Sequence, residues 1–268
     1  MKHDGFFRSH PVFTGDDLAE YLLSCGETGP RTQEALLAYN KKSRRIISVR
    51  RGLYAVVPPG ADPVSYPVDP FLVAAKLTND AVLSYHTALE LHGRAYSAYE
   101  HFTYTASRPL SPVTFRTHVF RGVKFPQALR RASKENFGVV TADRAAIEVR
   151  VTSLERTMVD TLNRPNLCGS WEEIWRSLES VEFFDLDQVV EYALLLGNAT
   201  TAAKVGFFLE QHRESLMVED NHLKPLRDNR PRRPHYLDRR KRTSGRLVSE
   251  WNLVVPQEVL EHSWADVL

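Results

Sequence analysis

Apolar residues near the start of the chain recur at the spacing of one helix face. They are Leu18, Tyr21, Leu22 and Cys25. Thr14 precedes them as a suitable N-cap, and Asp16 and Asp17 fall in the first turn, where the helix dipole favours negative charge. Gly26 and Gly29 break the pattern, so we predict a helix that begins at Thr14 and ends before these glycines.

A second helix and a β-hairpin follow directly. Pro30 suits the first turn of a helix that carries apolar residues at 35–37 and 39 and ends near Ser43. Two β-rich runs, 46–49 and 53–57, then flank the glycine-containing turn Arg50-Arg51-Gly52. Helix, helix and hairpin in this order predict a winged helix-turn-helix.

A winged helix normally has three helices, and the first is hard to find in this sequence. Residues 1–12 are short and irregular in pattern. We therefore expect either that the first helix is missing or that the C-terminal domain covers the face it would protect. Both alternatives make the autonomy of residues 1–60 doubtful.

The rest of the chain changes from β-rich to helical patterning. The predicted strands lie at 81–84, 102–105, 113–120, 123–125, 139–140 and 146–151, and the predicted helices at 69–77, 86–92, 154–162, 171–178, 186–196 and 202–210. Residues 246–256 read as one closing strand. Strands followed by helices predict an α+β fold. Because residues 58–63 are rich in Pro and Gly, we predict a winged-helix domain at 1–66, with a linker at 58–66, and a larger mixed α+β domain at 67–268.

Charge is distributed unevenly along the 268 residues, although the net charge is only +2. Residues 28–52 hold seven basic residues and one acidic residue, which gives +6. Residues 222–246 hold ten basic and two acidic residues, which gives +8. Subtracting both from +2 leaves −12 for the remainder, so the sequence describes two basic regions on an acidic body.

The first basic region coincides with the predicted winged helix and indicates DNA binding. The second helix of such a motif enters the major groove by its N-terminal residues, so Arg31, Thr32 and Gln33 are expected to face base edges. The wing residues Arg50 and Arg51 are expected to face phosphate. The remaining candidate contacts are Lys41, Lys42, Arg44 and Arg45. The alternative is a structural helix pair whose basic residues are merely solvated.

The second basic region has three interpretations. Its candidate contacts are Arg232, Arg233, Arg239, Arg240, Lys241 and Arg242. They belong either to a solvated, partly disordered loop, to a further DNA or RNA contact, or to a surface for an acidic protein partner. The neighbouring His235 and Tyr236 favour a contact, because both side chains can stack or form hydrogen bonds.

Motifs for catalysis, metal binding or membrane insertion are weak or missing. Cys25 and Cys168 have no zinc spacing, and no apolar run reaches the length of about 20 residues that a membrane helix needs. The N-terminus lacks the apolar core of a signal peptide, so we expect a cytoplasmic protein. We also expect no cofactor. We expect His86 and His92 to have structural roles. Arg156 and Asp160, four residues apart on a predicted helix, are expected to form a structural ion pair.

One arrangement deserves comparison with nucleotidyltransferases, which use a Gly-Ser pair followed by Asp-x-Asp. This chain has Gly169-Ser170 and, further on, Asp185-Leu186-Asp187. Because two-metal chemistry needs the carboxylates fixed together on a strand, and these aspartates stand where a helix is predicted to start, we expect helix capping. The sequence therefore predicts a protein that is not an enzyme.

Several segments, in order along the chain, resemble the AbiEi-like antitoxins of type IV toxin–antitoxin (abortive infection) systems. They are Val49-Arg50-Arg51-Gly52-Leu53-Tyr54-Ala55-Val56, the runs 69–77, 83–93 and 151–160, and the closing Glu250-Trp251-Asn252-Leu253-Val254-Val255-Pro256. The resemblance implies an N-terminal domain that binds the promoter of its own operon and represses it. It also implies a C-terminal domain that counteracts a nucleotidyltransferase toxin, by direct contact or by antagonising its effect. The alternative is a stand-alone winged-helix transcription regulator with a ligand-sensing C-terminal domain.

Overall fold

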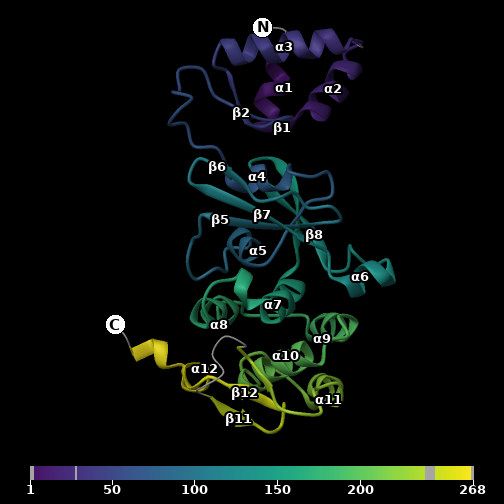
Figure 1. The fold of residues 1–268 in the computed structure, drawn as a ribbon, viewed down its shortest axis with the longest axis vertical. Helices are drawn as coiled ribbons and strands as arrows, with labels where there is room; N and C mark the ends of the chain where they lie inside the picture. Colours follow the sequence, from purple (N-terminus) through teal and green to yellow (C-terminus); the bar gives the residue numbers. More distant parts are fainter. Residues whose placement is uncertain (1–2, 28, 239–244, 267–268) are drawn as a thin grey trace. The chain divides into compact units, whose positions relative to one another are not determined.

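The computed structural model describes residues 3–27, 29–238 and 245–266, and its fold is mixed α+β as predicted. Twelve α-helices and three sheets occur within these ranges (Figure 1). The chain forms two compact units. The first comprises Met1–Leu83, Glu100–Gly122 and Thr141–Arg150, and the second comprises Ser84–Tyr99, Val123–Val140 and Val151–Leu268. The predicted boundary between residues 66 and 67 stays a prediction.

The N-terminal elements have the order of a winged helix. They are α1 (Asp4–Ser9), β1 (Val12–Thr14), α2 (Gly15–Ser24), α3 (Pro30–Lys42), β2 (Ile46–Arg50) and β3 (Leu53–Val56). The strands form an antiparallel sheet in the order β1-β3-β2. At the hairpin turn, Gly52 has a φ of 81°, a conformation that glycine adopts without a steric penalty.

Local signals in the sequence define both ends of the helix-turn-helix. The hydroxyl of Thr14 accepts a hydrogen bond from the backbone of Asp17, whose carboxylate accepts one in return from the backbone of Thr14. This reciprocal capping box starts α2. Pro30 occupies the first turn of α3, and Ser43 caps its C-terminus. The predicted helix-turn-helix is therefore present.

The expected absence of a first helix is wrong. Helix α1 is only six residues long, but Phe6 and Phe7 are 2% and 3% exposed and pack with the buried Phe13 of β1. Arg45 closes over this helix, with its guanidinium 2.7 Å from the carboxylate of Asp4. A helix this short has little intrinsic stability, so its burial in the domain core rather than its own pattern makes it form.

The remainder of the first unit joins the linker to a sheet. Helix α4 (Pro70–Ala75) is capped by Asp69, whose carboxylate also lies 2.7 Å from Arg144. Arg116 donates hydrogen bonds to the backbone carbonyls of Tyr66 and Pro63, so the linker is held by its own unit. Lys76 binds Asp17 at 2.9 Å, which connects α4 to the first turn of α2.

The largest sheet has six strands in the order β6-β7-β5-β4-β9-β8. Their bounds are β4 (Val82–Leu83), β5 (His101–Ala106), β6 (Val113–Phe115), β7 (His118–Lys124), β8 (Val139–Arg144) and β9 (Ile147–Thr152). The run 113–120, predicted as one strand, is instead a hairpin, because Arg116 adopts a left-handed φ of 55° between β6 and β7. The pairings of β4 with β5 and of β6 with β7 are antiparallel.

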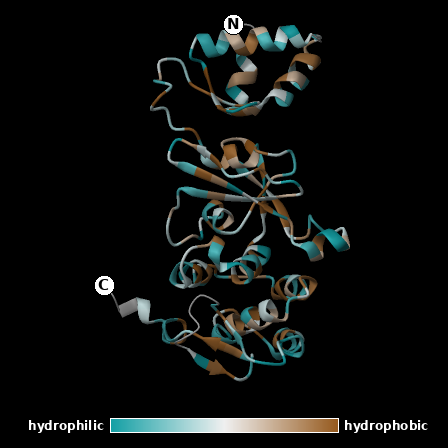
Figure 2. Ribbon diagram, in the orientation of Figure 1, coloured by the Kyte–Doolittle hydropathy of each residue, from teal (hydrophilic) through white to brown (hydrophobic). Residues whose placement is uncertain are grey.

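The second unit is mainly helical and contains the larger core. Its helices are α5 (His86–Leu91), α6 (Gln127–Ala132), α7 (Leu154–Asn163), α8 (Trp171–Glu179), α9 (Leu186–Leu195), α10 (Ala199–Gln211), α11 (Asp220–Asp228) and α12 (Gln257–Glu261). Fully buried Trp175, Trp251 and Phe208 belong to one hydrophobic cluster. In Figure 2 the hydrophobic stretches of α9 and α10 contrast with the hydrophilic α6 and α11.

Two expectations for the C-terminal region need correction. The basic region 222–246, for which a solvated loop was one interpretation, begins within helix α11, because Leu223 and Leu226 are buried, and its role as a contact stays a prediction. Residues 246–256, predicted as one strand, form the two strands β11 (Arg246–Val248) and β12 (Leu253–Val255), with Trp251 buried in the turn between them. Strand β10 (His235–Tyr236) pairs in parallel with β12.

Candidate nucleic-acid interface

Helix α3 has two chemically different faces. Its inner face consists of Gln33, Leu36, Leu37 and Asn40, all half-buried or buried. The residues Arg31, Ala35, Ala38 and Lys42 are exposed and recur at four-, three- and four-residue intervals, which places them on the opposite face. Because two alanines separate the two cations, this outer face can approach another surface closely.

The three predicted base-reading residues differ in their exposure. Arg31 and Thr32 are exposed, but the side-chain nitrogen of Gln33 donates a hydrogen bond of 2.6 Å to the carbonyl oxygen of Gly15. This bond ties α3 to the start of α2. Gln33 therefore has a structural partner that its spacing in the sequence did not reveal.

The cations around the hairpin also divide into two groups. Arg45 is bound to Asp4 and lies 5.0 Å from the ring centroid of Phe7, so it holds α1 in place. Lys41 is exposed, with its ammonium 4.8 Å from the ring centroid of Tyr54. The exposed cations Lys42, Arg44 and Arg51 and the half-buried Arg50 complete the set.

Sequence reasoning missed Ala35 and Ala38. Both are exposed on α3, where small apolar side chains can contact thymine methyl groups when a helix enters the major groove. Their signal was available, because they lie opposite the apolar pair Leu36 and Leu37. Tyr39, at 56% exposure, flanks the same outer face.

Two cations of the second basic region are paired with neighbouring carboxylates. Lys224 lies 2.6 Å from Asp228, and Arg227 forms ion pairs with Glu210 and Glu250. Arg232 and Arg233 are exposed. The candidates Arg239, Arg240, Lys241 and Arg242 lie outside the described residues. The count of +8 already includes Asp228 but not Glu210 and Glu250, so the pairing of Arg227 makes this count overstate the free positive charge of the region.

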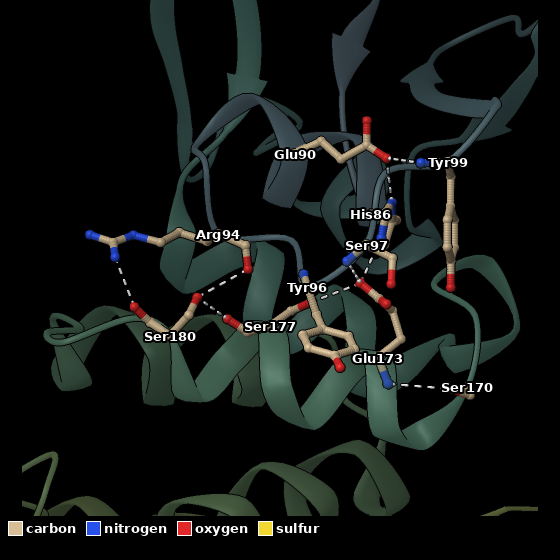
Figure 3. A network of polar contacts seen from close by, with 10 residues as sticks. All are labelled: His86, Glu90, Arg94, Tyr96, Ser97, Tyr99, Ser170, Glu173, Ser177 and Ser180. Atoms are coloured by element: carbon tan, nitrogen blue, oxygen red, sulfur yellow. Dashed lines mark hydrogen bonds and ion pairs between the residues drawn. The ribbon is translucent and has the colours of Figure 1, made fainter. Parts of the chain in front are cut away.

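His86 is the centre of a buried polar network in the second unit (Figure 3). Its Nε2 lies 3.0 Å from Glu173, its Nδ1 lies 3.0 Å from Glu90, and its ring stacks on Tyr99. Burial alone would lower the pKa of His86, but its contacts with Glu173 and Glu90 raise it. Burial would raise the pKa of Glu173, but the hydrogen bonds from His86 and Ser97 outweigh burial and lower this pKa to about 2.

This network connects structural elements. Glu173 also accepts hydrogen bonds from the backbone of Ser97 and the hydroxyl of Ser177, so it joins α8 to the segment that follows α5 (Figure 3). His92, the second histidine of that region, binds the carbonyl oxygen of Thr152 and takes no part in the network. In the part of the chain that the structure describes, no cluster of His, Cys, Asp or Glu is arranged to hold a metal ion.

The other candidate polar residues have positions typical of helix termini. Ser170 caps α8 and Asp185 caps α9, each accepting a hydrogen bond from a backbone nitrogen three residues later. Asp187 lies in the first turn of α9, as predicted.

Arg156 and Asp160 form the predicted ion pair at 3.4 Å within α7.

The second unit also contains a cavity of about 710 Å³. Its lining includes Trp171, Lys204, Asn163, Asp238, Glu258 and Trp264. Lys204 donates a hydrogen bond to the carbonyl oxygen of Leu162, and the indole nitrogen of Trp171 donates one to Asp238. The cavity thus combines indole surface, amide groups and more carboxylates than cations.

None of the helices within the described ranges has the length and apolar character needed to cross a bilayer. No protein-family model and no curated protein matches the chain. Among solved structures, the chain is similar to the RV2827C protein from Mycobacterium tuberculosis, with a TM-score of 0.59 and 16% sequence identity over 98% of this chain and 92% of that one. The similarity shows a shared fold over nearly the whole chain. Because the sequence identity is so low, it shows the fold alone.

Proposed function

We propose that this protein binds DNA through its winged helix and represses its own operon. The observation that carries the proposal is the outer face of α3, where Arg31 and Lys42 flank two exposed alanines. A helix with this face can enter the major groove, where arginine reads guanine and small apolar groups contact thymine. The cations of the hairpin, Arg50 and Arg51, supply phosphate contacts beside it.

The second part of the proposal is an antitoxin role. It is supported by the resemblance of five ordered segments, including 49–56 and 250–256, to the AbiEi-like antitoxins. In this proposal the chain counteracts a nucleotidyltransferase toxin without being an enzyme itself, and it acts in the cytoplasm. Whether it contacts the toxin or antagonises the toxin's effect is a separate question that co-purification answers.

A promoter-binding titration with matched variants tests the DNA-binding part. The parent protein should bind a duplex from its own promoter more tightly than a random duplex, and Arg31→Ala should reduce this preference. Arg8→Ala is the control, because Arg8 is an exposed cation on α1, away from the outer face of α3. Equal binding of the parent protein to both duplexes would contradict the proposal. Co-expression with the toxin tests the antitoxin part, since growth should recover.

The large cavity supports a second candidate, a transcription regulator that senses a small molecule. A volume of about 710 Å³ lies within the range of about 300–1,000 Å³ typical of ligand sites. Its lining includes one cation, Lys204, and three carboxylates, Asp238, Glu172 and Glu258, so an uncharged or cationic aromatic ligand fits better than an anion. Adenosine should then raise the unfolding temperature, AMP should not, and Trp171→Ala should abolish the effect. No response to adenosine or tryptamine would count against this candidate.

A further inference from the structure

A third basic region, which the sequence analysis missed, lies between Glu100 and Glu135. This segment holds seven basic residues and no acidic residue: Arg108, Arg116, Arg121, Lys124, Arg130, Arg131 and Lys134. Its charge was hidden in the total of −12 that remained after the two obvious regions were subtracted. All seven side chains are exposed.

Four of these residues gather around helix α6 in the second unit. Lys124 ends strand β7, Arg130 and Arg131 lie in the last turn of α6, and Lys134 follows it. Within the described residues, Lys124, Arg130 and Arg131 form no ion pair, and Lys134 has one half-exposed contact, at 3.7 Å, with Glu191. We call Lys124, Arg130, Arg131 and Lys134 the α6 cluster.

The α6 cluster stands on a fixed base. Leu129 is fully buried and anchors the helix to the core. The guanidinium of Arg156, itself fully buried, donates hydrogen bonds of 2.8 and 2.6 Å to the carbonyl oxygens of Glu135 and Phe137. Gly138 packs so tightly on Arg156 that a Cβ there would come within 2.9 Å of its side chain. The chain that carries the cations is therefore held within α6 and directly after it.

The composition of the α6 cluster favours a phosphate backbone over a folded protein as its partner. Protein interfaces have aromatic anchors at their centre, are enriched in arginine and are depleted in lysine. The exposed side chains of α6 and its C-terminal flank are Gln127, Arg130, Arg131, Ala132, Ser133 and Lys134, without an aromatic residue among them, and α6 is hydrophilic in Figure 2. Such a surface offers charge and hydrogen-bond donors but little apolar area.

We propose that the α6 cluster is a second, sequence-independent contact with the phosphates of double-stranded DNA. It deepens the proposed function, because it adds affinity without adding sequence recognition. Each phosphate neutralised contributes about 0.9 to the slope of log K against log salt. Loss of three contacting cations should therefore reduce that slope by about 2–3.

The test compares full-length variants on a random-sequence duplex across salt concentrations. Arg130→Gln, Arg131→Gln and Lys134→Gln together should reduce the slope by about 2–3 and weaken random and promoter duplexes equally. The matched control combines Arg176→Gln, Arg213→Gln and Lys224→Gln, which remove the same charge from cations already paired with Glu172, Asp220 and Asp228. This control should keep the parent slope. Arg130→Lys with Arg131→Lys should keep it too, which excludes misfolding as the cause.

Three outcomes would overturn the inference. In the first, the α6 triple variant keeps the salt slope of the parent protein; in the second, the control variant loses as much of the salt slope as the α6 variant does. In the third, the parent protein does not bind random duplex at ~50 mM salt. Loss of toxin neutralisation with unchanged DNA binding would assign the α6 cluster to a protein partner instead. Failure of the proposed promoter recognition is detected separately, because Arg31→Ala changes the preference between the two duplexes and the α6 variant does not.

Discussion

The side-chain nitrogen of Gln33 lies 2.6 Å from the carbonyl oxygen of Gly15, and this hydrogen bond joins the two helices of the helix-turn-helix. Arg31, two residues earlier, is exposed on the outer face of α3. Neighbouring polar residues on one helix therefore have different tasks. The first fixes the position of α3, and the second is available to a groove.

Arg31→Ala and Gln33→Ala should consequently differ in two measurements. Arg31→Ala should cost about 1–3 kcal/mol in binding to the promoter duplex and relax specificity at one base pair, with little effect on stability. Gln33→Ala should lower the free energy of unfolding by about 1 kcal/mol and weaken all duplexes alike. Polarisation titrations and urea denaturation measure these effects. A specificity change in Gln33→Ala, equal to that in Arg31→Ala, would refute this division.

The short first helix should be essential to the winged helix. Phe6→Ala should destabilise this domain by about 3–5 kcal/mol, because it leaves a cavity beside the buried Phe13. Chemical denaturation combined with promoter binding measures both consequences. Gly5→Ala is the control, since a Cβ at Gly5 meets no atom within 4 Å. Unchanged stability in Phe6→Ala would show that α1 is dispensable.

Arg51, in the wing turn, and Arg45, which pairs with Asp4 of α1, should affect different properties. We expect the first to contribute to DNA binding and the second to stability. Arg51→Ala should lower the salt slope of binding by about 1 on every duplex, with no loss of stability, because Arg51 is exposed at the turn. Arg45→Ala should instead destabilise the domain, since it removes the partner of Asp4. Salt titrations and thermal unfolding of both variants separate these roles. A salt slope that falls only in Arg45→Ala would reverse the assignment.

The second basic region can be tested beside the α6 cluster. Neutralising Arg239, Arg240, Lys241 and Arg242 together should lower the salt slope by up to about 3–4 if all four residues contact phosphate. A parent slope would remove this region from the DNA contacts. Loss of toxin neutralisation in the same variant would then assign it to the partner surface.

Stability of the second unit should fall as the pH rises above about 6.5. The contacts with Glu173 and Glu90 raise the pKa of His86 in the folded protein, against the effect of burial. The stability gained from the charged ring is therefore fully present below its unfolded pKa of about 6.5 and is lost as the pH rises through the higher folded value. The other groups near this ring are Tyr99, whose pKa is raised by burial and by neighbouring carboxylates, and Cys168, whose pKa burial raises.

Denaturation midpoints at a series of pH values check this prediction. The parent protein should lose stability as the pH rises above about 6.5, and His86→Gln should be less stable below that pH but flatter over the same range. Glu173 should affect stability at low pH. Because its pKa is lowered to about 2, its contribution is lost as the pH falls from its ordinary value towards 2. An identical pH profile in His86→Gln would contradict the role of the histidine.

The sequence alone determined the elements whose signals are local. Thr14 and Asp17 form their capping box from adjacent turns, Pro30 starts α3, and Gly52 permits the hairpin turn. Helices α7 to α10 were also predicted from apolar residues at helical spacing, although α10 is buried on all sides from Thr200 to Leu209. These features depend on residues a few positions apart, so their physics is contained in the sequence.

Tertiary structure decided the features that depend on distant partners. Helix α1 is stabilised by burial against Phe13, and Trp251 divides the predicted closing strand because it packs into the core. The same holds for charge. Arg227 is neutralised by Glu210 and Glu250 from other elements, whereas Arg130 has no ion pair within the described residues. A sequence count gives the number of charges, but only the fold determines which of them lie beside a carboxylate and which face solvent.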